Sequence, residues 1–218
     1  RTIRIPVETV LGKDGVSLAD CAIAESKFEK GEDISGRILL LVSQLGEVQK
    51  KGTPDIEFAM VGLLARSQIA LGRAEDALRT VQMIRERFAE NGHTRFFHNI
   101  DAAICRIWLH MDDLERVQVW YREQAPKDPL HLNVLKRYQY LTQAMAELAL
   151  GMPDAVLLTL APLESYCKDC SRYIDGIHIN VLEAIALYRK KDSLWKEKLN
   201  SALDVAQEFG FIRTISVY

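Results

Sequence analysis

Residues Gln68–Leu78 read "QIALGRAEDAL", and residues Glu147–Leu157 read "ELALGMPDAVL". Both stretches run through an apolar segment that ends in Ala-Leu-Gly, continue with a few polar residues that include an acid, and resume with an Ala. The two glycines, Gly72 and Gly151, lie 79 residues apart. Repetition of this kind predicts equivalent turns in a repeated structure, with another turn expected halfway between them.

Three further turns complete a regular period. The midpoint falls near Met111, in "RIWLHMDDLERVQ", while Gly31 precedes the pair and Lys191 follows it at similar intervals. The five predicted turn positions are 31, 72, 111, 151 and 191, separated by 41, 39, 40 and 40 residues. A period of about forty residues is typical of helical-repeat arrays.

A small residue recurs at one place in each predicted repeat. The residues seven positions before the turns are Ala24, Ala65, Ile104, Ala144 and Ala184. Four of the five are alanine, and Ile104 is the exception. A small side chain at a fixed point of the first helix lets the second helix of a hairpin approach closely.

The period therefore predicts an all-α fold, a tetratricopeptide-like superhelical array of about five antiparallel helix hairpins. The predicted first helices cover residues 17–30, 54–71, 94–110, 131–150 and 172–190. The predicted second helices cover residues 33–51, 74–90, 113–124, 154–168 and 192–209. At Thr53–Glu57, "TPDIE" offers an N-cap hydroxyl, a proline at the first helical position and acids in the first turn. We expect residues 17–218 to form one helical-repeat domain, and the alternating residues of 1–16 to form an extended arm.

Composition excludes several classes of protein. The chain has 218 residues, of which 48% are hydrophobic and 27% charged, as in ordinary globular proteins. A net charge of −2 predicts no direct contact with nucleic acid, and the longest apolar runs are too short to cross a membrane. Four cysteines without regular pairing, and no signal peptide, are typical of reduced thiols in a cytoplasmic protein. The first residue is not Met, which indicates a processed chain or a fragment.

Several segments carry a family resemblance. They are "AICRIWLHMDDLERVQVWYREQ", "YLTQAMAELALGMPDAVLLTLAPLESY", "SRYIDGIHINVLEAIALYRKKD" and the closing "SALDVAQEFGFIRTIS". Together they resemble the helical-repeat region of MalT-like, LuxR-family ATP-dependent transcriptional regulators, over about residues 17–218. The resemblance implies a parent protein in which the repeats lie between an ATPase module and a C-terminal helix-turn-helix. No G-x-x-x-x-G-K-[ST] loop occurs here, so both modules would lie outside this chain.

Signals for catalysis, metals or cofactors are weak. "CKDC" at Cys167–Cys170 has the spacing of half a zinc site or of a redox pair, but no second ligand pair exists. Acid pairs such as Asp112–Asp113 fall at predicted turns, where their negative charge stabilises the N-terminus of the helix that follows. The histidines show no metalloprotease spacing. We expect no enzyme activity, no metal and no cofactor.

A binding surface remains as the candidate site. First helices line the concave face of a tetratricopeptide-like superhelix, and the predicted turns set their register. The predicted ligand- or partner-binding residues are Arg66, His98, Asp101, Trp108, Tyr138, Met145, His178 and Tyr188. Aromatic groups mixed with a few polar ones suit a small-molecule effector or a regulatory protein. The alternative is that many of these side chains, about half by the ordinary burial of aromatics, pack against neighbouring repeats.

Two functions are compatible with these patterns. The chain is either the sensor and signal-transmission segment of a LuxR-type regulator, or a general scaffold for protein–protein interaction without a transcriptional role. A helix-turn-helix encoded in the same gene would favour the first. The charged run "YRKKDSLWKEK" at Tyr188–Lys198 is most simply a solvated turn and helix face, with a basic contact for a partner domain as the alternative.

Overall fold

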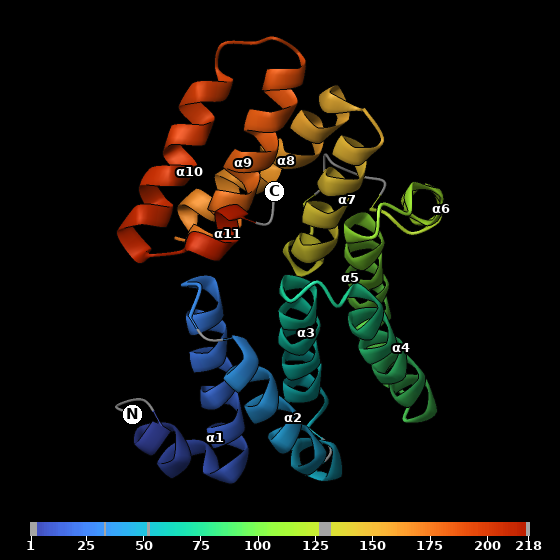
Figure 1. The fold of residues 1–218 in the computed structure, drawn as a ribbon, viewed down its shortest axis with the longest axis vertical. Coiled ribbons are helices and arrows are strands. Elements are labelled where there is room, and N and C mark those ends of the chain that lie inside the picture. The colour runs from blue at the N-terminus through green and yellow to red at the C-terminus, as the bar shows by residue number, and fades with distance from the viewer. Residues whose placement is uncertain (1–3, 33, 52, 127–131, 217–218) are drawn as a thin grey trace. The chain divides into compact units, whose positions relative to one another are not determined.

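The computed structural model describes residues 4–32, 34–51, 53–126 and 132–216, and all regular elements in these ranges are helical. Figure 1 shows helices that follow one another as antiparallel pairs, so the predicted all-α array is confirmed. The chain separates into two compact units, residues 1–97 and 98–218, and each is described by itself. The single domain predicted over residues 17–218 therefore stays a prediction.

The first unit contains two long hairpins. Its helices are α1 (Arg4–Glu29), α2 (Ile34–Lys51), α3 (Pro54–Ala70) and α4 (Ala74–Glu90), followed by the 3₁₀ turn η1 (Thr94–Phe96). Pro54 occupies the first position of α3, as predicted, although the Thr53 hydroxyl makes no capping hydrogen bond. Residues of α1, α2 and α3 share one apolar core: Cys21, Ala24, Phe28, Leu41, Val48, Ile56, Met60, Leu63 and Leu64.

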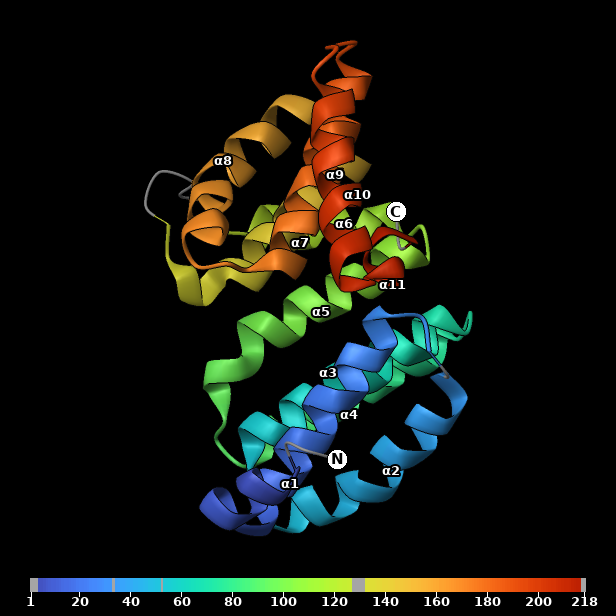
Figure 2. The ribbon, with the colours of Figure 1, turned by 90° about the vertical axis from the view of Figure 1, so that its left-hand side faces the viewer.

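The second unit continues the same pattern. Its helices are α5 (Phe97–His110), α6 (Leu114–Glu123), α7 (Arg137–Ala149), α8 (Pro153–Asp169), α9 (Tyr173–Arg189), α10 (Trp195–Phe209) and the short α11 (Ile212–Ser216), with η2 (Val134–Lys136) before α7. Figure 2 shows α9 and α10 side by side, with α11 beside them. The main core joins α7, α8 and α9 through Tyr140, Leu141, Ala144, Leu148, Val156, Leu160, Leu163, Cys167, Ile179, Leu182 and Ala186.

All five predicted turns share one backbone geometry. A residue with left-handed φ stands in each turn, at Gly31, Gly72, Asp112, Gly151 and Lys191. The amide of the following residue donates to the carbonyl five positions back, as in Arg73 N to Gln68 O at 2.9 Å and Asp192 N to Leu187 O at 3.0 Å. These bonds satisfy carbonyls that the end of a helix leaves without partners, and they define a Schellman motif. The same geometry ends helices at Gly92, Ser171 and Gly210, so it is the common helix end of this fold and includes all five turns within hairpins.

One turn position was predicted one residue too early. The left-handed residue of the third hairpin is Asp112, not Met111. Seven residues before Asp112 lies Cys105, which is fully buried, in place of the larger Ile104. With this correction, a small buried residue stands at the same point of every first helix: Ala24, Ala65, Cys105, Ala144 and Ala184. Close approach of paired helices therefore depends on the same position throughout the chain.

The predicted extended arm is wrong where the structure describes it, because α1 already begins at Arg4. Pro6 falls within the first turn of α1, where the amide that proline lacks would have no helical partner in any case. The predicted helix starts at 33 and 131 lie outside the described residues. The predicted start at 17 is wrong, because α1 begins thirteen residues earlier. The remaining predicted ends agree with the structure to within a few residues, and α10 starts later because Asp192 and Ser193 belong to the turn.

Candidate functional site

Three of the predicted site residues pack into hydrophobic clusters. Trp108 and Tyr138 are partly buried against a cluster that contains Cys105 and Trp120, and Met145 packs against the main core of the second unit. Their aromatic and thioether groups thus contribute to packing between hairpins. The expectation that a good share of the predicted set packs in this way holds for these three.

Arg66 is engaged within the first unit. Its Nη1 donates to Glu25 Oε1 at 3.2 Å, its Nη2 bonds to Glu29 Oε1, and its guanidinium lies 4.8 Å from the ring centre of Phe28. Glu29 is 1% exposed, and a buried carboxylate is stable only with such a partner. Arg66 therefore joins α3 to α1, and its first role is structural.

A second arginine joins first helices in the other unit. Arg106 of α5 donates from Nε to Thr142 Oγ1 at 2.7 Å, and its guanidinium lies 3.9 Å from the ring centre of Tyr138. Beside it, Gln139 Nε2 donates to Asn99 Oδ1 at 3.0 Å. These polar contacts connect α5 to α7 along the first-helix side.

The link continues from α7 to α9. Arg137 Nε lies 2.8 Å from Asp175 Oδ2, and Arg189 Nη1 donates to the carbonyl of Leu148 at the end of α7. These arginines were not predicted as a group. A signal was present, however, because Arg66 and Arg106 each stand six residues before the left-handed residue of their hairpin.

Four predicted residues remain accessible to different degrees. His98, in the first turn of α5, is exposed, whereas Asp101 of α5 and His178 of α9 are half-buried. Tyr188 is 64% exposed and meets Trp195 edge to face, with ring centres 5.4 Å apart. The structure thus does not gather the eight predicted residues into one cavity.

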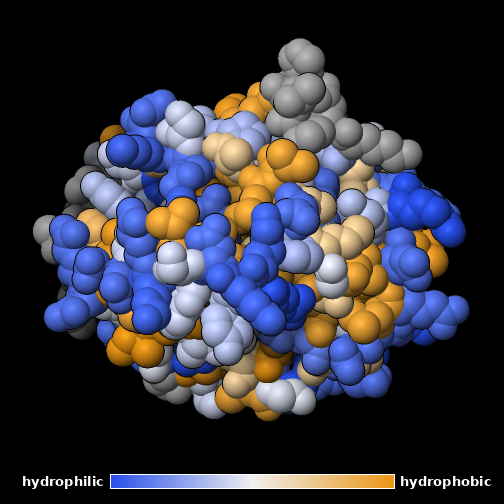
Figure 3. Space-filling view, turned by 90° about the horizontal axis from the view of Figure 1, so that it is seen from above, coloured by the Kyte–Doolittle hydropathy of each residue, from blue (hydrophilic) through white to orange (hydrophobic). Residues whose placement is uncertain are grey.

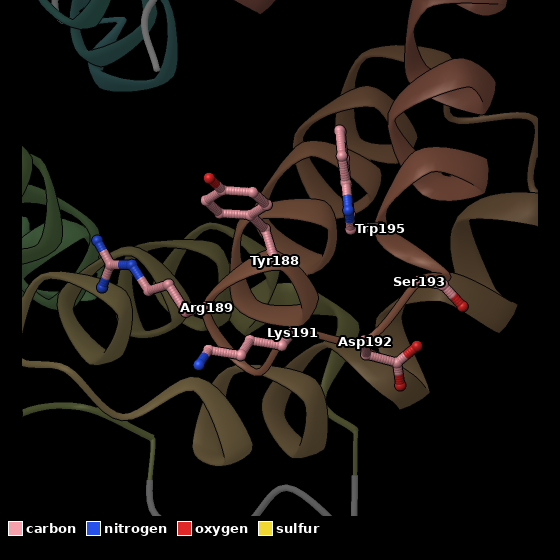
Figure 4. A pocket seen from close by; sticks show the side chains of 6 residues that line it. All are labelled: Tyr188, Arg189, Lys191, Asp192, Ser193 and Trp195. Atoms are coloured by element: carbon pink, nitrogen blue, oxygen red, sulfur yellow. The ribbon is translucent and has the colours of Figure 1, made fainter.

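The turn between α9 and α10 carries a hollow, and this turn lies within the charged run Tyr188–Lys198. The hollow measures about 420 Å³ and is lined by Tyr188, Arg189, Lys191, Asp192, Ser193 and Trp195 (Figure 4). Another hollow, of about 350 Å³, lies where α8, α9 and α10 meet, and Cys167, Arg172 and Tyr173 are among its lining residues. Both hollows belong to the second unit.

Two carboxylates in the second unit are almost fully buried. Glu147 Oε1 accepts from Gln143 Nε2 at 2.7 Å and from Thr159 Oγ1 at 3.0 Å. Glu183 pairs with Lys198 Nζ at 2.6 Å. Burial raises the pKa of both carboxyl groups, and the hydrogen bonds to Glu147 and the lysine beside Glu183 oppose that rise. Each acid therefore joins two neighbouring helices, Glu147 joining α7 to α8 and Glu183 joining α9 to α10.

The "CKDC" pair is split between two environments. Cys167 is buried in the core and Cys170 is exposed. Burial raises the pKa of the Cys167 thiol to about 11, which keeps it protonated at neutral pH. Among the described residues, no three His, Cys, Asp or Glu side chains are arranged to hold a metal ion.

Comparison with known families decides the assignment. The family model of the MalT-like tetratricopeptide (TPR) region matches residues 40–216. The chain belongs to the family of MalT-like TPR regions. Neither a curated protein nor a solved structure shows significant similarity to it. The resemblance based on the four quoted segments is therefore confirmed for residues 40–216.

Repeat regions of this family typically mediate interactions and are typically non-catalytic. None of the helices that the structure describes is long and apolar enough to span a membrane. On the face of the molecule in Figure 3, hydrophobic residues (orange) form small groups separated by hydrophilic side chains (blue). Mixed surfaces of this kind suit recognition by a few aromatic and charged groups.

Proposed function

We propose that this MalT-like TPR region is the sensor and signal-transmission segment of a LuxR-type transcriptional regulator. In this role it binds a small effector or a regulatory protein on the first-helix side and passes the change along its hairpins. The supporting observation is the row of arginine contacts that connects α5, α7 and α9. Arg106 and Arg137 each reach from one first helix to the next, and Arg189 reaches from α9 back to α7.

The chemistry of these contacts supports transmission. Each partly buried hydrogen bond or ion pair contributes on the order of 1–2 kcal/mol, so these contacts rearrange at a lower cost than a packed apolar core. A ligand that contacts two first helices can favour one arrangement of the arginines over another, and so shift the angle between hairpins. Repeats contact mainly their neighbours, which restricts such a shift to the direction of the array.

The binding residues proposed for this surface are those of the first-helix side. Within the second unit they are His98, Asp101, Trp108, Tyr138, Met145, His178 and Tyr188. Arg66 is the corresponding residue of the first unit. Exposed His98 and Tyr188 are the best positions for a test, because their replacement disturbs little packing.

A thermal-shift panel tests this function. Wild-type protein is screened against oligosaccharides, amino acids, nucleotides and short peptides, and each ligand that raises the melting temperature is repeated with His98→Ala and Tyr188→Ala. Leu158→Ala on α8 is the matched control, because Leu158 is 68% exposed and lies on a second helix. We expect the ligand-induced shift to fall in the first-helix variants and to persist in Leu158→Ala.

Two outcomes contradict the proposal. One is a panel in which no ligand stabilises the protein. The other is a ligand whose effect is lost in Leu158→Ala but kept in both first-helix variants, which would place binding on the second helices. The absence of a helix-turn-helix from the encoding gene would favour the general interaction scaffold.

A further inference from the structure

The turn between α9 and α10 combines features that the packing of the hairpin does not require. Tyr188 and Trp195 project to the same side of the turn (Figure 4). Tyr188 is 64% exposed although it is a large aromatic residue, and its ring meets that of Trp195 nearly at right angles, with ring centres 5.4 Å apart. An accessible aromatic pair of this kind is typical of a recognition site, because its rings offer apolar area at a low entropic cost.

The backbone of the same turn is strained. Lys191 has φ 60°, whereas Gly72 and Gly151 occupy the equivalent positions of the second and fourth hairpins. A residue with a Cβ pays a conformational cost in the left-handed region that glycine does not pay. Strained residues of this kind gather at functional sites. The Lys191 side chain is exposed at this position, and Asp112 and Ser171 adopt the same left-handed conformation elsewhere in the chain.

Charge is concentrated at this turn. Between Tyr188 and Lys198 stand five basic residues, Arg189, Lys190, Lys191, Lys196 and Lys198, and two acids, Asp192 and Glu197. Asp154, Glu164 and Glu183, which lie in α8 and α9, offset the excess of positive charge within this run. Lys190 and Lys198 are paired with acids of α8 and α9. In the part of the chain that the structure describes, Lys191 has no ion-pair partner. Asp192 accepts a hydrogen bond from the amide of Leu194, so the acid in the hollow is already engaged.

The layout of these groups indicates the shape of the occupant. In Figure 4 the side chains of Arg189 and Lys191 extend away from the two aromatic rings, on the opposite side from Asp192 and Ser193. A compact small molecule is normally enclosed over most of its surface, which a hollow at an open turn does not provide. An extended chain can place an apolar side chain against the rings and carboxylates beside the cations.

We propose that the α9–α10 turn binds an acidic protein segment that carries an aromatic side chain. This inference rests on the proposed function and names the partner: the regulatory protein contacts the repeat region through such a segment. The aromatic side chain packs against Tyr188 and Trp195, and the flanking carboxylates pair with Lys191 and with the free donors of Arg189. The affinity of the segment falls with increasing salt, because the cations are exposed to solvent.

The probe is the synthetic peptide Asp-Glu-Glu-Phe-Glu-Glu-Asp, titrated into the full chain while the indole N–H signal of Trp195 is followed by nuclear magnetic resonance. The expected result is a saturable shift of that signal, with the signals of Trp108 and Trp120 unchanged. Lys191→Gly is the decisive variant, because glycine suits the backbone of the turn and removes only the charged side chain. We expect Lys191→Gly to bind about fivefold more weakly or worse, with an unchanged or raised melting temperature.

Matched controls separate charge from backbone. Asp112→Gly relieves the same strain in the third hairpin and should bind the peptide as wild type does. A peptide with lysine in place of each acid should not bind. Equal binding of the lysine peptide, equal affinity of Lys191→Gly and wild type, or saturation by phenylacetate at the same concentration would each overturn the inference, the last by assigning the turn to small aromatic acids. If the thermal-shift panel yields a ligand while the acidic peptide leaves Trp195 unmoved, this inference fails and the proposed function stands.

Discussion

The guanidinium carbon of Arg106 lies 3.9 Å from the ring centre of Tyr138, so one residue of α5 covers the aromatic face of a residue at the start of α7. The same side chain donates to Thr142, one turn further along α7. A single arginine thus fixes both the separation and the register of two first helices. Since α5 and α7 belong to successive hairpins, this contact is a joint of the array.

Replacing Arg106 should weaken that joint. We expect Arg106→Ala to lower the free energy of unfolding by about 1–2 kcal/mol, from the loss of a charge-assisted hydrogen bond and a cation–π contact. Urea denaturation measures the change. Arg122→Ala is the control, because Arg122 is exposed and pairs with neighbouring Glu123, and its effect should stay within about 0.5 kcal/mol. Equal effects of the two variants would show that the Arg106 contact contributes no more than a surface pair.

The turn residues offer a test of the repeat register. Lys191→Gly should raise the free energy of unfolding by about 0.5–1 kcal/mol, because the gain from relieving left-handed backbone exceeds the entropy that glycine adds to the unfolded chain. Gly151→Ala should lower it by about 1 kcal/mol for the opposite reason. Apart from Gly151 and its two chain neighbours, no described residue places an atom within 4 Å of a Cβ added there, so the cost is conformational and not steric. Changes of the same sign in both variants would contradict the equivalence of the two turns.

Glu147 should make stability depend on pH. Its pKa in the folded chain is raised by burial, so its contribution to stability is present below the unfolded pKa, near 4.5, and is lost as the pH rises through the folded value. Glu147→Gln keeps a side-chain carbonyl as acceptor and removes the charge. We therefore expect the stability of Glu147→Gln relative to wild type to increase from pH 4.5 upward and to level off above the folded pKa.

Chemical denaturation at a series of pH values measures this difference. Glu115→Gln, at an exposed position of α6, is the control. A difference between Glu147→Gln and wild type that stays constant with pH would show that Glu147 does not titrate differently in the folded chain.

The four thiols should differ in reactivity. Cys170 is exposed, whereas Cys21, Cys105 and Cys167 are buried, with pKa values raised to about 11, 12 and 11. Ellman's reagent should label one thiol on the order of ten times faster than the rest, and Cys170→Ser should remove that fast phase. A fast phase that survives in Cys170→Ser would show that a buried thiol becomes accessible in the native protein.

The repeat could be predicted because each hairpin uses the same local chemistry. Glycine at positions 31, 72 and 151 marks a left-handed turn that glycine adopts without strain. The third turn was displaced by one residue because Asp112 takes the left-handed conformation there, and no glycine reveals its place. Asp tolerates this conformation better than most residues, which is a weaker signal. The helix at Arg4 was missed because a short alternation of apolar residues is compatible with either extended or helical structure.

The site could be predicted only in part. Sequence register identifies which residues belong to first helices, but it does not distinguish exposed Tyr188 from packed Trp108, although both stand three residues before the predicted turn positions. Trp108 is packed because residues of α7, in the following hairpin, belong to the same cluster. No described hairpin covers Tyr188 in this way. The arginine contacts between α5, α7 and α9 join residues more than thirty positions apart, so their partners follow from the three-dimensional arrangement alone.

Hydrogen–deuterium exchange tests most directly the central claim, that ligand binding on the first-helix side is passed along the arginine contacts. The full chain is measured with and without the panel ligand that raises its melting temperature most, and the experiment is repeated with Arg106→Ala. The account predicts slower exchange in α5, α7 and α9 together in wild type, and protection limited to the helix that contacts the ligand in Arg106→Ala. Protection confined to the contacted helix in wild type, or centred on α8 and α10, would contradict it.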